Sequence, residues 1–189
     1  MKAAFVVYEG LTALDFVGAY DPITRLGTMG FIDAEWDVCA RTESVTANGG
    51  LTIRPDRIEP DLGEYDLCFV PGGFPARGLR DDEPFLEWLR TAADCRYKTS
   101  VCTGSLLLGA AGFLEGRRAT THPTAYDLLS EYCEVSEERV VADERVITGR
   151  GVSSSIDLGL AVVEELTDAV TREEIARQMD YPYGGDGRP

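Results

Sequence analysis

The feature that most constrains this chain is an alternation between short apolar runs and segments whose apolar residues recur every three or four positions. A run that is apolar throughout is typical of a strand buried on both faces, as in a parallel sheet covered by helices. The sequence therefore predicts a doubly wound α/β sandwich. The predicted strands span 2–8, 35–40, 65–73, 97–101, 138–143 and 145–149, and the predicted helices span 12–27, 83–95, 104–114, 124–132, 154–166 and 171–179.

Local signals predict a hairpin and the starts of two of these helices. Asn48-Gly49-Gly50 lies between two alternating runs and predicts a β-hairpin over 44–53. Thr12 with Asp15 and Thr124 with Asp127 match the capping-box spacing, which predicts the start of a helix at each site.

The length of 189 residues favours one domain over 1–189, with a surface tail at 181–189 that is rich in Pro and Gly. The sequence contains no run of 18 uncharged apolar residues and no pattern of a secretory signal. We expect a cytoplasmic protein without a membrane partner.

The charge balance is strongly acidic. Asp and Glu number 33 against 18 Lys and Arg, which gives a formal net charge of −15, and Lys2 and Lys98 are the only lysines. Such a surface repels nucleic acid and anionic lipid, so we expect no nucleic-acid partner. An acidic, lysine-poor composition also favours a halophilic protein adapted to a saline cytoplasm over one that is acidic only for solubility.

The cysteines divide into one candidate nucleophile and four core residues. Their odd number and irregular spacing argue against a disulfide framework, and with a single histidine the chain has no pattern for a metal site. We expect neither metal nor cofactor. The four cysteines expected to be inert lie within or beside apolar runs: Cys39, Cys68, Cys95 and Cys133.

Cys102 differs because it follows the strand over 97–101 and precedes the helix over 104–114. A nucleophile on such a strand-to-helix turn is exposed above the sheet in a strained conformation, as in the serine elbow of hydrolases. The N-terminus of the next helix would favour the thiolate and lower its pKa. We therefore expect Cys102 to be the reactive thiol of a nucleophile elbow.

Asp15 is the second candidate, with two interpretations. It could cap the first helix, or it could lie beside Cys102 at the same sheet edge, where proximity would raise its pKa and make it a proton shuttle. Gly72 and Gly73 follow another strand and could offer N–H groups to an anion. His122 is either a hydrogen-bonded structural residue or, less favoured, a catalytic partner of Cys102.

Four segments in the same order resemble the ThiJ/PfpI superfamily, which is class I glutamine amidotransferase-like. They are SVCTGSLLLGAAGFLEGRRATTHPTA, LTALDFVG, FVPGG and GRGVSSSIDLGLAVVEEL. The chain looks most like the isocyanide hydratase branch, which has aspartate at the position of Asp15 and threonine at the position of Thr103. His122-Pro123 instead is similar to the deglycase branch, and Ala19 replaces a common proline; we expect both positions to shape the pocket.

The resemblance implies a flavodoxin-like fold, a homodimer, and a lyase that needs no cofactor. Cys102, Asp15 and Thr103 would be catalytic, with Gly72, Gly73 and His122 binding a small-molecule substrate. Cys102 would attack an isocyanide, and water would release an N-substituted formamide. The alternatives are a glutathione-independent glyoxalase or deglycase acting on methylglyoxal, and a redox-sensing or ligand-binding domain without catalysis.

The charge count predicts that salt stabilises the fold. The net charge of −15 opposes compaction, and the screening length falls from about 10 Å at 0.1 M salt to about 3 Å at 1 M. We expect the melting temperature in molar KCl to exceed that in dilute buffer by several degrees and to keep rising beyond molar salt. A flat or falling melting temperature across this series would leave the acidic composition as a solubility feature only.

Overall fold

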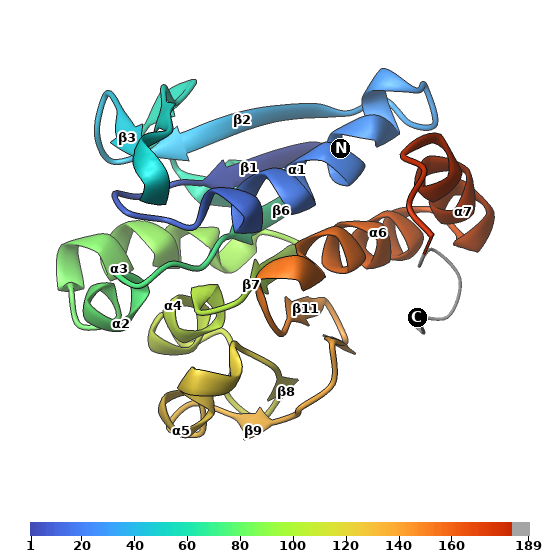
Figure 1. Cartoon of the computed structure of the whole chain (residues 1–189). Helices are drawn as coiled ribbons and strands as arrows, with labels where there is room; N and C mark the ends of the chain where they lie inside the picture. The colour runs from blue at the N-terminus through green and yellow to red at the C-terminus, as the bar shows by residue number, and fades with distance from the viewer. Residues whose placement is uncertain (183–189) are drawn as a thin grey trace.

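The computed structural model describes residues 1–182, and its centre is a seven-stranded sheet, which runs through the middle of the molecule in Figure 1. The strand order is β10-β11-β7-β6-β1-β2-β5, and all neighbours are parallel except β10 with β11. The strands of this sheet are β1 (Lys2–Val6), β2 (Glu35–Ala40), β5 (Arg57–Ile58), β6 (Leu67–Val70), β7 (Tyr97–Val101), β10 (Val140–Asp143) and β11 (Val146–Gly149). The predicted α/β architecture is confirmed.

Helices cover both faces because parallel crossovers are right-handed. The chain leaves β1 in one direction to reach β2, then returns to β6 on the other side of β1 and proceeds to β7. This reversal puts α1 and α6 together on one face and α3 and α4 on the other (Figure 1). The helices are α1 (Ala13–Thr28), α2 (Ala76–Leu79), α3 (Glu83–Arg90), α4 (Gly104–Ala110), α5 (Tyr126–Leu129), α6 (Ser155–Leu166) and α7 (Ala169–Gln178).

The remaining strands form two small sheets. The predicted hairpin is confirmed, with β3 (Val45–Thr46) antiparallel to β4 (Thr52–Ile53). The other pair is β8 (Arg118–Ala119) with β9 (Glu134–Val135). Within residues 1–182, no helix combines the length and the apolar character needed to cross a bilayer.

Several predicted boundaries are wrong at the helix ends. The predicted helix 83–95 changes to a 3-10 turn at 91–94, and the predicted helix 124–132 is helical only over Tyr126–Leu129. The predicted surface tail starts too early at 181, because Tyr181 is half-buried and donates to Asp157 Oδ1 at 2.8 Å. The rest of the predicted tail, 183–189, lies outside the described residues.

Neither predicted capping box forms. The Thr12 side chain caps nothing, and the Ala13 N–H instead donates to Asn48 Oδ1 of the hairpin at 3.1 Å. At the other site, His122 Nδ1 accepts from the Thr124 N–H. Spacing alone does not reveal such contacts, because a cap can come from a distant loop that competes with the local side chain.

The packing of α1 on α6 depends on glycine. A Cβ on Gly159 of α6 would lie 2.4 Å from Pro22 Cγ and 3.0 Å from Ala19 O, both in α1. A Cβ on Gly18 of α1 would lie 2.0 Å from Ser155 Oγ of α6. The two helices therefore approach too closely for side chains at these positions, and the contact fixes α1, the helix that carries Asp15.

We expect Gly159→Ala to destabilise the protein by about 1–3 kcal/mol, because an added methyl group overpacks a filled interface. Thermal unfolding would measure the change. Gly78→Ala in α2 is the matched control, since nothing lies within 4 Å of its added Cβ, and it should be neutral or slightly stabilising. Equal melting temperatures for wild type and Gly159→Ala would contradict the close α1–α6 contact.

Candidate active site

The candidate site lies where the strand order reverses. The chain runs outward from β1 to β2 on one side and from β6 to β7 on the other, so the loops after β1 and β6 diverge at the carboxyl ends of these strands. Ligands of open α/β sheets bind at such a switch point. The loop after β6 carries Gly72 and Gly73, α1 follows β1 and carries Asp15, and Cys102 directly follows β7.

Cys102 has the strained backbone expected of a nucleophile elbow. Its φ is 56°, a left-handed conformation that costs a non-glycine residue about 1–2 kcal/mol. Hydrogen bonds on both sides hold the peptide in place: the Cys102 N–H donates to Gly149 O at 2.9 Å, and Thr121 Oγ1 donates to Cys102 O at 2.8 Å. The predicted strain is confirmed, and Thr121 is a supporting residue that the sequence analysis missed.

Asp15 is fully buried beneath the loop after β6. Neither of its carboxylate oxygens has a hydrogen bond of regular geometry within residues 1–182. Burial raises the pKa of Asp15 to about 7, although the facing Cys102 thiol and Gly72 N–H each lower it. The direction agrees with the shuttle interpretation, but its main cause is desolvation rather than a neighbouring charge. Asp15 does not cap the helix.

Cys102 differs from the expectation of an exposed, low-pKa thiol. The residue is only 5% exposed, and burial together with the Asp15 charge raises its pKa, although the N–H and hydroxyl of Thr103 lower it. Desolvation therefore outweighs the groups at the start of α4. Because Asp15 opposes the thiolate only when it is ionised, a Cys102 thiolate is less disfavoured when Asp15 is protonated.

Gly72 and Gly73 do not form the predicted anion site. The Gly72 N–H faces Asp15, and the Gly73 N–H donates to Thr103 Oγ1 at 2.9 Å. The Gly73 donor is therefore already engaged, and the Gly72 N–H is directed at Asp15 rather than at the pocket. Gly72 instead permits a close approach, because a Cβ there would lie 2.7 Å from Cys102 Cβ and 2.8 Å from Asp15 Oδ2.

Thr103 fastens the elbow to the loop after β6. Its hydroxyl accepts from the Gly73 N–H and donates to Gly73 O at 2.8 Å. Thr103 lines the pocket beside Cys102, where it positions the two loops relative to each other.

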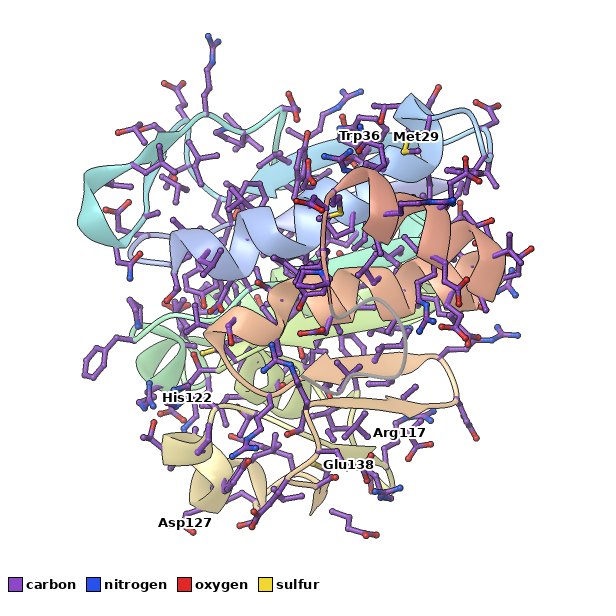
Figure 2. The ribbon with its side chains drawn as sticks, turned by 45° about the vertical axis from the view of Figure 1, so that its right-hand side comes forward. Met29, Trp36, Arg117, His122, Asp127 and Glu138 are labelled. Carbon is purple, nitrogen blue, oxygen red and sulfur yellow. The ribbon has the colours of Figure 1, made fainter. Side chains whose placement is uncertain are left out.

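His122 belongs to the same pocket but not to the Cys102–Asp15 pair. Its Nδ1 lies 2.9 Å from Thr124 Oγ1 and accepts from the Thr124 N–H, the structural role that the sequence analysis favoured. Figure 2 shows His122 at the end of the sheet where the parallel strands terminate, and Trp36 at the opposite end. Ala19, expected to shape the pocket, instead lies buried against Gly159.

The pocket above Cys102 has a volume of about 180 Å³. It is lined by Thr12, Gly73, Phe74, Arg77, Cys102, Thr103, His122, Thr124 and Val152. A larger groove of about 1170 Å³ lies by Lys98 and Arg117, at the other end of β7. Arg117 is far from His122 in Figure 2, and the large groove contains none of the candidate catalytic residues.

Tyr8 is a second residue that the sequence analysis missed. Its buried hydroxyl donates to Pro71 O at 2.9 Å and so ties the end of β1 to the loop after β6. Burial raises the pKa of Tyr8, and the nearby Asp15 and Cys102 raise it further. The signal in the sequence was the position of Tyr8 at the end of an apolar run, where it could have been identified as a residue near the site.

The inert character expected of the remaining cysteines stays a prediction, and none of them lines the pocket above Cys102. Burial raises the pKa of Cys39, Cys68, Cys95 and Cys133; only Cys133 is partly exposed among them. Among residues 1–182, no three His, Cys, Asp or Glu side chains are grouped closely enough to hold a metal ion.

A stability measurement distinguishes a buried shuttle from a helix cap. The pKa of Asp15 is raised in the folded state, so its neutral form favours folding below the unfolded value, and that contribution is lost as pH rises through about 7. We expect Asp15→Asn to melt above wild type at pH 8, with the difference vanishing towards pH 4. A variant less stable than wild type at pH 8 would restore the capping interpretation.

Comparison with known proteins shows which proteins this chain is similar to. Residues 1–165 match the DJ-1/PfpI family. The chain is 36% identical to isonitrile hydratase of Pseudomonas putida over 96% of its own length and 78% of that protein. It is 30% identical to the Parkinson disease protein 7 homolog of Danio rerio, over 96% and 95% of the two chains.

Two further matches extend the comparison. A crystal structure of a ThiJ/PfpI family protein from Pseudomonas syringae superimposes with a TM-score of 0.84 at 34% identity, over 100% of this chain and 76% of that one. The transcriptional regulator CdhR of Pseudomonas aeruginosa is 34% identical over 93% of this chain, which spans 53% of the regulator. With a family match over most of its length and a site at the predicted elbow, this chain belongs to the DJ-1/PfpI family.

Proposed function

We propose that the protein is a cysteine-dependent hydratase that adds water to a small electrophile, most specifically an isocyanide. One observation carries the proposal: Cys102 lies on a strained elbow at the floor of a small pocket, against a buried Asp15 whose pKa is about 7. A hydration needs a group that both donates and accepts a proton, with a pKa close to the working pH. The 36% identity to isonitrile hydratase favours an isocyanide as the electrophile.

In the first step the Cys102 sulfur attacks the terminal carbon of the isocyanide. A carbon–sulfur bond forms while the proton shared by Cys102 and Asp15 is delivered to the same carbon. The product is a thioimidate on Cys102, and Asp15 is left ionised. Because Asp15 is buried, its ionised form is costly, which favours proton uptake in the next step.

In the second step water adds to the carbon–nitrogen double bond of the thioimidate. Asp15 takes a proton from the water and passes it to the nitrogen, which gives a tetrahedral intermediate with Asp15 ionised again; the proton released in the next step is that of the new hydroxyl group. The carbon–sulfur bond then breaks, an N-substituted formamide leaves, and the proton returns to the Cys102–Asp15 pair. One isocyanide and one water are consumed for each formamide.

The pH dependence follows from the shared proton. Below pH 7 both Cys102 and Asp15 are protonated, and the pair carries no charge to form a thiolate. Loss of one proton, with an apparent pKa near that of Asp15, about 7, generates the active pair. We expect kcat/KM to rise with pH through about 7, and Asp15→Asn to remove this inflection and to lower turnover by about two to four orders of magnitude.

The decisive experiment measures steady-state turnover of an aryl isocyanide and of methylglyoxal. We expect wild type to convert the isocyanide to a formamide, and Cys102→Ser to lose this activity while Cys133→Ser, the control at the partly exposed thiol, retains it. Turnover of methylglyoxal alone would support the glyoxalase alternative, which the DJ-1 relatives keep open. No turnover of either compound, with reversible oxidation of Cys102, would support a redox sensor.

The homodimer implied by the resemblance stays a prediction. Leu14 and Val17 on α1 are 45% and 40% exposed, an apolar face that a second copy would cover. Light scattering in solution checks the mass, and a monomer across the working concentration range would contradict this expectation.

A further inference from the structure

Among residues 1–182, the outer wall of the Cys102 pocket carries one permanently charged side chain, Arg77. The other side chains that line the pocket are neutral or, for Cys102 and His122, titratable. Asp15 lies under Gly72 and does not line the pocket. Arg77 thus places a positive charge beside the pocket of a protein whose net charge is −15.

Arg77 has no acidic partner in residues 1–182, whereas Arg80 in the next turn pairs with Glu131. Its two contacts are neutral: Nη2 donates to Thr124 Oγ1 at 2.9 Å, and the guanidinium carbon lies 5.6 Å from the centre of the Phe74 ring. A guanidinium has five N–H donors in a fixed plane. Most of them are therefore available to a bound molecule.

Two neighbours, Thr124 and Phe74, contact this guanidinium. Thr124 Oγ1, which accepts from Arg77, also lies 2.9 Å from His122 Nδ1, so the contact belongs to a hydrogen-bonded chain along the wall. Phe74 is 82% exposed beside the pocket. A cation held in place next to an exposed aromatic ring presents an anion-binding group and an apolar surface to the same ligand.

From this wall we propose that Arg77 and Phe74 form a carboxylate subsite, and that the substrate is a small electrophile carrying a carboxylate. This inference rests on the proposed function for the identity of the electrophile. The volume of about 180 Å³ holds about six water-sized groups at about 30 Å³ each, which matches isocyanoacetate. Its hydration consumes one water and gives N-formylglycine. The isocyanide carbon would lie at Cys102 and the carboxylate at Arg77.

A binding measurement tests the subsite without requiring turnover. N-formylglycine and its methyl ester are titrated into the wild-type protein by calorimetry. We expect the acid to bind about 10- to 100-fold more tightly than the ester, because a hydrogen bond to a charged group is stronger than one to a neutral group. Arg77→Gln should remove this preference and Arg77→Lys should keep part of it.

The matched control is Arg90→Gln, which removes one positive charge from α3 where Arg90 pairs with Glu83 at the surface. It should leave the preference for the acid unchanged. Equal binding of acid and ester by wild type, a comparison that needs no variant, would overturn the subsite. A loss of the preference in Arg90→Gln as large as in Arg77→Gln would also overturn it, because net charge would then be the cause.

Turnover separates the two proposals. We expect Arg77→Gln to raise KM for isocyanoacetate about 10-fold or more while KM for methyl isocyanoacetate stays unchanged. Hydration of both compounds with equal KM would overturn the subsite and leave the hydratase proposal intact. Hydration of neither, with Arg77-dependent binding of N-formylglycine, would overturn the hydratase proposal and support the carboxylate subsite alone.

Discussion

The site depends on the close approach of the Cys102 elbow to the loop after β6. A side chain at position 72 would collide with Cys102 and Asp15, so only glycine fits there. Thr103 holds the same loop through two hydrogen bonds to Gly73. The left-handed backbone of Cys102 is tolerated because the β11 carbonyl and the Thr121 hydroxyl hold its peptide on both sides. Rigid local packing of this kind can support strain at a functional residue.

The same packing determines the pKa values of Asp15 and Cys102. Asp15 is buried without a regular hydrogen bond in the described chain, so its carboxylate form is disfavoured and its pKa rises to about 7. Burial raises the pKa of Cys102 as well. In the proposed mechanism the two residues therefore share one proton, and the charge of the pair changes near neutral pH.

The inner and outer walls of the pocket come from different parts of the fold. The inner wall holds Cys102 and Thr103 on elements packed into the core, where geometry is fixed. The outer wall, with Phe74, Arg77 and His122, comes from the loops and short turns that follow β6 and β8. Variation in such loops changes the ligand while the scaffold keeps the nucleophile in place.

The sequence by itself determined the sheet, most of the helices, and Cys102 as the elbow residue, because apolar periodicity and the strand-to-helix boundary are local patterns. It also placed Asp15 at the right edge of the sheet. Only the tertiary structure decided that Asp15 is buried rather than a cap, that the Gly73 donor is already engaged, and that Arg77 lies at the pocket without an acidic partner among residues 1–182. These properties depend on contacts between residues far apart in the chain, where burial and competition for hydrogen bonds override local spacing.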